Sequence, residues 1–115
     1  MERVSVFYKD KKVKISVKRV SNFGKYVGLM FSSSKKQNLL FDFSRERAVA
    51  IHSLFVFYPF LALWLNEKNK IMEITIIKPF TFLIVPKNRP SKLVEIPLNE
   101  KNRKIIEFFV GKGKV

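Results

Sequence analysis

Few side chains in the sequence could take part in covalent chemistry, and their spacing assembles no catalytic group. His52 is the single histidine, and Ser53 follows it directly. Neighbouring residues on a strand point to opposite faces, so this pair cannot act as base and nucleophile on one surface. Glu73 and Glu95 could meet across strands as an acid–base pair, although solvent-facing positions beside lysines are the simpler expectation. We therefore predict no catalytic residue, and a hydrolase that combines His52 with Glu73 or Glu95 is the least favoured of three functional hypotheses.

Metal and cofactor sites find equally little support in the composition. The chain has no cysteine and one histidine, so a zinc site would have to consist almost wholly of carboxylates. The GKGK segment at residues 111–114 lacks the spacing and the following helix of a phosphate-binding loop. The sequence therefore predicts no metal ion, no cofactor and no disulfide.

Positive charge is the most prominent chemical feature of the chain. The formal net charge is +14, from 23 lysine and arginine residues against 9 aspartate and glutamate residues. Such a surface attracts polyanions such as nucleic acid, although a solvated lysine surface without a ligand has the same composition. Our first hypothesis is a polyanion-binding module that uses basic residues of a first hairpin and a following loop: Lys9, Lys11, Lys12, Lys14, Lys18, Arg19, Lys35 and Lys36.

Aromatic residues are relevant to polyanion binding and also suggest a second hypothesis, a ligand pocket. Single-stranded nucleic acid would need exposed rings on which bases stack, and the candidates are Tyr8, Tyr26, Tyr58 and Trp64. The second hypothesis is a β domain that binds a small ligand or a protein in a pocket near His52 and Trp64. A lone histidine in an apolar strand is more often a hydrogen-bonded structural residue.

The elements that would position these residues are mainly strands. Residues 3–8 and 12–18 flank a polar turn, and Val13, Ile15 and Val17 alternate with Lys12 and the other polar residues of the second segment. A period of two over this length predicts a half-buried strand with a basic solvent face.

The longest uncharged run, residues 48–65, is the main alternative to a strand-rich domain. It approaches the length of a membrane helix, which needs about 20 apolar residues. Pro59 near its middle would break such a helix, and its aromatic and branched residues favour strands. We predict two core strands, residues 49–58 and 60–65, which fold back and pair at Pro59, and no membrane span.

The remaining segments predict short elements. Ser21 or Asn22 could cap a helix whose apolar stripe runs from Phe23 to Phe31, and residues 66–69 predict a tight turn. In the next strand Glu73 and Thr75 should share one face, and Met72, Ile74 and Ile76 the other. Four prolines divide the C-terminal half into short apolar pieces at residues 80–85, 92–96 and 105–110, which excludes a long helix there, while residues 98–104 could form a short helical turn.

Six motifs occur in an order that resembles a known family. They are GLMF (28–31), LLFDF (39–43), IHSLFVFYP (51–59), WLNEKNKIMEI (64–74), KPF (78–80) and LVEIP (93–97). Together they resemble the uncharacterised family named domain of unknown function 192, which is common in archaea and bacteria, and the likeness covers residues 13–110. The resemblance implies a compact, mostly β domain with a curled sheet or half-barrel and no established activity.

The departures from the family pattern fall on its polar positions. An arginine usually occurs soon after Gly-Leu-Met, where this chain has Phe31 and Ser32. Ile-Asp usually follows the aromatic-Pro step, where it has Phe60 and Leu61. The family's Asp-x-x-Gly turn is Asn66 to Asn69 here. His52 is the one ionisable group that matches, so a site formed by those polar positions in relatives would be either absent here or used differently.

These observations predict one α+β, mostly β domain spanning residues 1–115, with a curled antiparallel or mixed sheet of half-barrel type and one or two short helices. The first residues, MERVSVFYKDKK, do not resemble a secretory signal, and the chain has no thiol. We therefore expect a cytoplasmic binding module rather than an enzyme.

Overall fold

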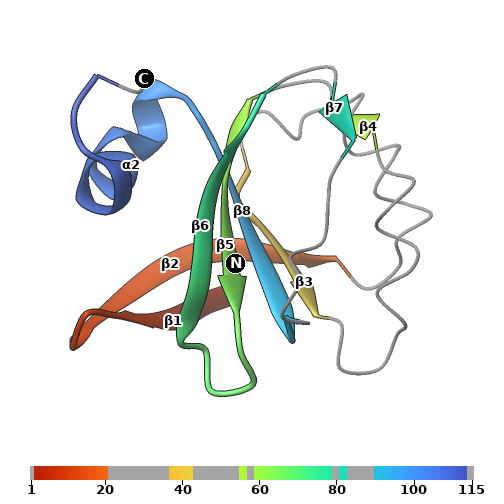
Figure 1. Ribbon diagram of the computed structural model, residues 1–115, viewed down its shortest axis with the longest axis vertical. Helices are drawn as coiled ribbons and strands as arrows, with labels where there is room; N and C mark the ends of the chain where they lie inside the picture. The colour runs from red at the N-terminus through yellow and green to blue at the C-terminus, as the bar shows by residue number, and fades with distance from the viewer. Residues whose placement is uncertain are drawn as a thin grey trace.

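A computed structural model of the chain describes residues 2–20, 37–42, 55–56, 59–78, 81–82 and 90–113. Most of these residues form strands of a curled sheet, and one short α-helix lies at one end of it (Figure 1). A six-stranded sheet has the order β1-β2-β3-β8-β5-β6, in which β2 and β3 are parallel and the other neighbours antiparallel. This confirms the predicted mostly β fold with a curled, mixed, half-barrel sheet. The strand bounds are Glu2–Tyr8 for β1, Lys11–Val20 for β2, Leu39–Asp42 for β3, Lys92–Pro97 for β8, Phe60–Leu65 for β5 and Ile71–Ile77 for β6.

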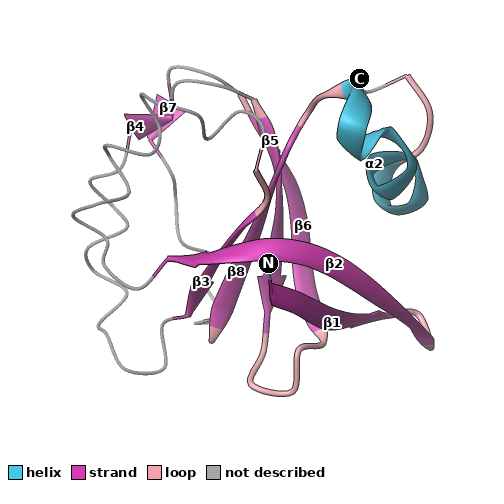
Figure 2. Cartoon of the chain, turned by 180° about the vertical axis from the view of Figure 1, so that it is seen from behind, coloured by secondary structure: helices cyan, strands magenta, loops and turns pink. Residues whose placement is uncertain are grey.

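The first two strands form the predicted hairpin. Lys9 and Asp10 connect them with φ angles of 47° and 64°, and positive φ at both central residues matches the right-handed twist of the flanking strands. Ile15 and Val17 are fully buried, whereas Lys12 and Lys14 are exposed, which confirms the period-two prediction. The hairpin extends past the other strands on the side that carries the helix (Figure 2).

The long apolar run contributes a central strand but does not pair with itself. Its second half, β5 (Phe60–Leu65), has the predicted bounds, and all six of its residues are buried. Both edges of β5 are hydrogen-bonded, one to β6 and one to β8, whereas β4 (Phe55–Val56) pairs with β7 (Thr81–Phe82) in a separate two-stranded sheet. The predicted pairing of the two halves is therefore wrong, because a strand has only two edges. The rest of the predicted strand at residues 49–58 lies outside the described residues.

A membrane span finds no support in the described ranges, where no helix has both the length and the apolar character needed to cross a bilayer. The helix predicted between Phe23 and Phe31 falls outside these ranges.

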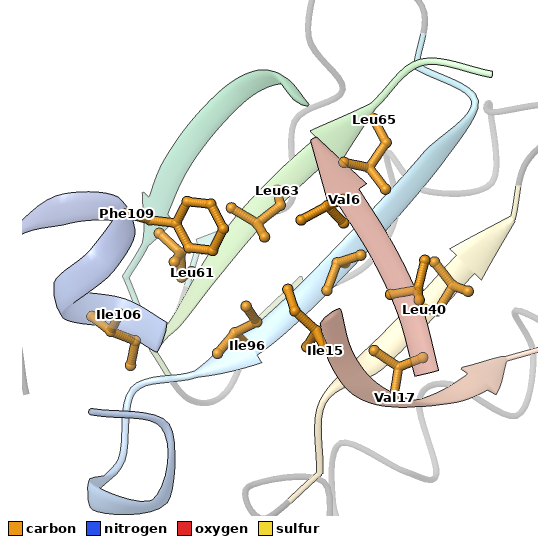
Figure 3. Close-up of a cluster of buried hydrophobic side chains, with 12 residues drawn as sticks. Val6, Ile15, Val17, Leu40, Leu61, Leu63, Leu65, Ile96, Ile106 and Phe109 are labelled. Carbon is orange, nitrogen blue, oxygen red and sulfur yellow. The ribbon is translucent and has the colours of Figure 1, made fainter. Parts of the chain in front are cut away.

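The main core lies inside the curl of the sheet (Figure 3). Alternate residues of each strand point inward, because side chains alternate between the faces of a sheet. The helix adds Ile106 and Phe109 from one end. The fully buried aliphatic residues of this cluster are Val6, Ile15, Val17, Leu40, Leu61, Leu63, Leu65, Val94, Ile96 and Ile106.

One strand departs from the predicted alternation. The register between β5 and β6 shifts between Trp64 and Leu65, which pair with Glu73 and Ile71 and leave Met72 without a partner. A bulge of this kind places an extra residue in one strand. Ile71, Ile74 and Ile76 consequently pack on the core, and the prediction that Met72 shares their face is wrong: it is 38% exposed.

The chain ends in a short helical segment rather than a further strand. The 3-10 turn η3 (Glu100–Asn102) is capped by Asn99, whose side chain accepts a hydrogen bond from the Asn102 backbone at 3.0 Å. Helix α2 (Arg103–Val110) follows and buries Ile106 and Phe109, which are three residues apart and therefore lie on one face. The predicted helical turn at residues 98–104 agrees with η3, and the apolar piece at residues 105–110 is helical.

Candidate polyanion-binding surface

An exposed aromatic ring lies between two lysines on the outside of the hairpin. Phe7 in β1 is paired with Lys12 in β2, and a single bridge pairs it with Lys70, which directly precedes β6. The Phe7 backbone N–H donates to the carbonyl of Asn69 at 3.0 Å, which fixes this bridge. Paired residues project from the same side of a sheet with Cβ atoms roughly 5 Å apart. Lys12, Phe7 and Lys70 thus form a row across neighbouring strands, and the Phe7 side chain is 42% exposed.

The cationic surface continues along the hairpin. Lys14 is paired with Ser5 in the next row, and Arg3 with Ser16 in the row after it. Residues two apart on a strand share a face and are separated by about 6.8 Å. We call this surface the hairpin outer face, and it comprises Arg3, Ser5, Phe7, Lys12, Lys14, Ser16, Lys18 and Lys70.

None of the salt bridges in the described ranges neutralises the cations of the hairpin outer face. Arg3, Lys12, Lys14, Lys18 and Lys70 are exposed. The salt bridges within the described ranges join Arg19 to Glu2 and Asp42, and Arg103 to Glu100 and Glu107; none involves these five cations. The hairpin outer face is therefore positive without compensation from a bound carboxylate in the described part of the chain.

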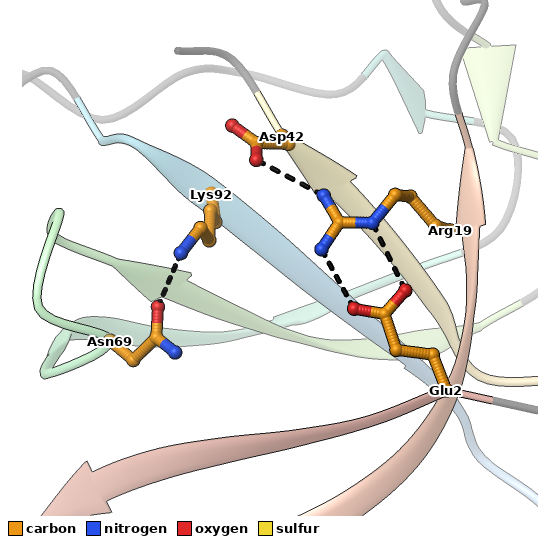
Figure 4. Close-up of polar contacts among 5 residues, drawn as sticks. All are labelled: Glu2, Arg19, Asp42, Asn69 and Lys92. Carbon is orange, nitrogen blue, oxygen red and sulfur yellow. Dashed lines mark hydrogen bonds and ion pairs between the residues drawn. The ribbon is translucent and has the colours of Figure 1, made fainter.

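Arg19 differs from the other predicted basic residues because two carboxylates hold it (Figure 4). Its Nε and one terminal nitrogen donate to the two oxygens of Glu2 at 3.0 and 2.7 Å, and its other terminal nitrogen donates to Asp42 at 3.1 Å. The hydrogen bonds from Arg19, with its charge, lower the pKa of the Glu2 carboxyl below its ordinary value. Because neighbours on a strand point to opposite faces, Arg19 also lies on the other side of β2 from Lys18.

The remaining basic residues of the prediction are dispersed. Lys9 lies in the turn with its Nζ 5.2 Å from the centre of the Tyr8 ring. Lys11 is paired with Tyr8 and has its Nζ 5.9 Å from the centre of the Phe108 ring in α2. Lys12, Lys14 and Lys18 are the predicted residues that share one face, whereas Lys35 and Lys36 lie outside the described residues.

Two of the four aromatic predictions, Trp64 and Tyr8, need correction, and the exposed ring of the row, Phe7, was not among those predicted. Trp64 is 1% exposed, so its ring offers no open face to a base. The pocket predicted near His52 and Trp64 stays a prediction. Tyr8 is half-buried against the rings of Phe108 and Phe109. His52, Tyr26 and Tyr58 lie outside the described residues. Phe7 could have been found from the sequence, since it follows Arg3 and Ser5 at every second position of β1.

The two glutamates do not form the acid–base pair that the sequence had left open. Glu73 lies opposite Trp64 on β6 and accepts a hydrogen bond from the Thr75 hydroxyl at 3.3 Å, while Glu95 lies on β8 opposite Ala62. Strand β5 separates them, and two strand spacings amount to about 9.5 Å. Glu95 is fully buried, so the expectation that both carboxylates face solvent is also wrong. The described residues contain no group of three or more histidine, cysteine, aspartate or glutamate side chains placed to hold a metal ion.

Comparison with known proteins places the chain in a family. A UPF0127 protein of Pyrococcus furiosus is 32% identical over 92 residues, which cover 77% of this chain and 78% of that protein. The chain belongs to the UPF0127 family. This confirms the expectation of an uncharacterised family. The resemblance to domain of unknown function 192, which was based on the order of the motifs, stays a prediction. No family model matches this UPF0127 chain, and no solved structure matches it.

Proposed function

We propose that this UPF0127 chain binds an extended polyanion, such as nucleic acid, through the hairpin outer face. The observation that carries the proposal is the row of Lys12, Phe7 and Lys70, together with the absence of ion pairs to its lysines in the described ranges. Phosphate groups that replace small counterions near such lysines release those ions, which favours binding at low salt.

The arrangement of the cations suits an extended ligand better than a compact one. Lys12 and Lys14 repeat along β2, Lys70 lies across β1 from Lys12, and Arg3 lies farther along β1. A compact anion would need several donors that converge on one point, as at a bidentate arginine site. Arg19 is directed at Glu2 and Asp42 instead, so it adds no donor to the hairpin outer face.

Salt-dependent binding tests the proposal. The ligand is a short fluorescein-labelled oligonucleotide, and fluorescence anisotropy gives the affinity between about 50 and 200 mM salt. The triple variant Lys12→Gln/Lys14→Gln/Lys70→Gln should reduce the slope of log affinity against log salt by about 2 to 3, because each neutralised phosphate contributes roughly 0.7 to 0.9.

A matched control separates this face from the overall positive charge. Lys101, Lys104 and Lys112 are also exposed, and they lie in or next to the C-terminal helical segment. The variant Lys101→Gln/Lys104→Gln/Lys112→Gln loses the same charge and should keep the wild-type slope. Equal losses in both variants, or no binding by the wild type at the lowest salt, would refute the proposal.

A cytoplasmic location is a further part of the proposal. It rests on the absence of cysteine, which suits a reducing compartment. Fractionation of the producing cells tests it, and recovery with the exported proteins would contradict it.

A further inference from the structure

We infer that the polyanion is a single-stranded nucleic acid, one base of which stacks on Phe7. This inference rests on the proposed function, because it names the ligand class of the same surface. It follows from the position and exposure of one ring rather than from the charge.

Among the aromatic residues that the structure describes, Phe7 is placed differently from the others. Phe41, Phe60 and Trp64 are at most 1% exposed, and Phe108, which is 42% exposed, packs its ring against Tyr8 and Phe109. Phe7 is equally exposed, yet none of the ring–ring contacts within the described ranges involves it. It occupies a position in β1 where the alternation otherwise supplies Arg3 and Ser5. An open aromatic face on a strand is the feature on which unpaired bases stack.

The neighbours of Phe7 make the same point. Lys12 and Lys70 lie on either side of the ring across the strands, each roughly 5 Å away at Cβ. A nucleotide whose base lies on the ring therefore has a lysine on both sides to meet its own phosphate and the adjoining one. Lys14, about 6.8 Å farther along β2, is positioned for the next phosphate.

The exposed ring favours a single-stranded over a double-stranded nucleic acid as the ligand. In a duplex both faces of an internal base are covered by stacked neighbours, so Phe7 could meet only the backbone. A single strand offers its bases freely, and stacking on an aromatic side chain tolerates any base. An anionic lipid surface would also be attracted by the lysines, but it has no planar group to stack on one isolated ring.

The experiment compares ligands of equal charge with and without bases. Labelled oligothymidine and an abasic strand of the same length are titrated with the wild type, Phe7→Ala and Phe7→Trp, with anisotropy as the readout. Phe7→Ala should weaken oligothymidine binding by about 5-fold to 150-fold, the range that corresponds to loss of one stacked base. Binding of the abasic strand should not change, and Phe7→Trp should restore or strengthen binding to oligothymidine.

Phe108→Ala is the matched control, since Phe108 has the same exposed fraction but packs against Tyr8, which lies on the opposite face of β1 from Phe7. Its affinity for oligothymidine should equal that of the wild type.

If the wild type binds both strands equally and Phe7→Ala changes neither, stacking is overturned while polyanion binding stands. Binding to anionic vesicles but to neither strand overturns the inference in favour of a lipid surface. If the wild type binds no polyanion at all, the proposed function fails and the inference with it. Should Phe7→Ala not fold, the comparison of the two strands with wild type and Phe7→Trp still decides the outcome.

Discussion

Replacing Arg19 should weaken the fold without weakening polyanion binding. The guanidinium makes two hydrogen bonds to Glu2 and one to Asp42, which joins the start of β1 to the ends of β2 and β3. The variant Arg19→Met keeps much of the side-chain volume and removes the charge. It also leaves Glu2 and Asp42, two like charges, without the cation between them.

The expected loss follows from how exposed these groups are. The side chains of Arg19 and Glu2 are 44% and 40% exposed, so water and salt screen the pair. Exposed ion pairs contribute about 0.2 to 1 kcal/mol each. Because Arg19 takes part in two such pairs, Arg19→Met should lower the free energy of unfolding at neutral pH by about 1 kcal/mol. This loss corresponds to a decrease of roughly 4 °C in the melting temperature.

The loss should depend on pH in a defined direction. Because the pKa of Glu2 is lowered in the folded chain, its stabilisation is present above the ordinary value of 4.5 and disappears as the pH falls through the folded value. Urea denaturation at neutral and acidic pH should therefore show a difference between wild type and Arg19→Met that is full at neutral pH. That difference should shrink below about pH 4.5.

Lys18→Met is the matched comparison, because Lys18 precedes Arg19 on the same strand and faces the other side. It should change stability by less than about 0.5 kcal/mol but reduce the salt slope of nucleic acid binding by about 0.7 to 0.9. The reasoning is refuted if Arg19→Met keeps wild-type stability at neutral pH and instead reduces the slope by that amount. Arg19 would then act as part of the binding face.

Two further substitutions test how the fold positions the hairpin outer face. Phe109→Ala should lower the free energy of unfolding by about 3 to 5 kcal/mol, because Phe109 is buried where α2 meets the core, and urea denaturation should show a much smaller loss for the exposed Phe108→Ala. Equal losses in Phe109→Ala and Phe108→Ala would contradict the packing of α2 on the core through Phe109. Asn66→Ala should cost about 1 to 2 kcal/mol, because the Asn66 side-chain oxygen accepts hydrogen bonds from the Lys68 and Lys70 backbones at 2.9 Å each. Asn66→Asp keeps an acceptor there and should unfold close to the wild-type denaturant concentration, so a loss as large as that of Asn66→Ala would contradict this account of the turn.

Local patterns in the sequence predicted the elements whose two faces meet different surroundings. The alternation of Val13, Ile15 and Val17 with lysines was enough to define β2, because one face packs on the core and the other meets water. The tight turn from Asn66 to Asn69 was also predictable, since asparagine accepts backbone hydrogen bonds and tolerates positive φ, which is 64° at Asn69.

Features that depend on distant partners could not be predicted in this way. Glu95 lies in a central strand between Leu39 and Ala62, and nothing in its local pattern distinguishes that burial from a solvent-facing position. The outward turn of Met72 depends on a register shift against Trp64 and Leu65. The binding row was missed for the same reason, because Lys70 becomes a neighbour of Phe7 only through a bridge between the first strand and the sixth.

That bridge also sets when the proposed ligand could first be captured. Lys12 lies beside Phe7 as soon as the first hairpin forms, through contacts between residues close in the chain. Lys70 arrives only after a long loop has closed, and closing such loops is slow compared with forming a hairpin. A ribosome-bound chain that has emerged only as far as β3 would therefore hold Lys12 and Phe7 without Lys70, and full affinity would be acquired later in synthesis. Full polyanion affinity would then report that the first strand has met the segment that precedes β6.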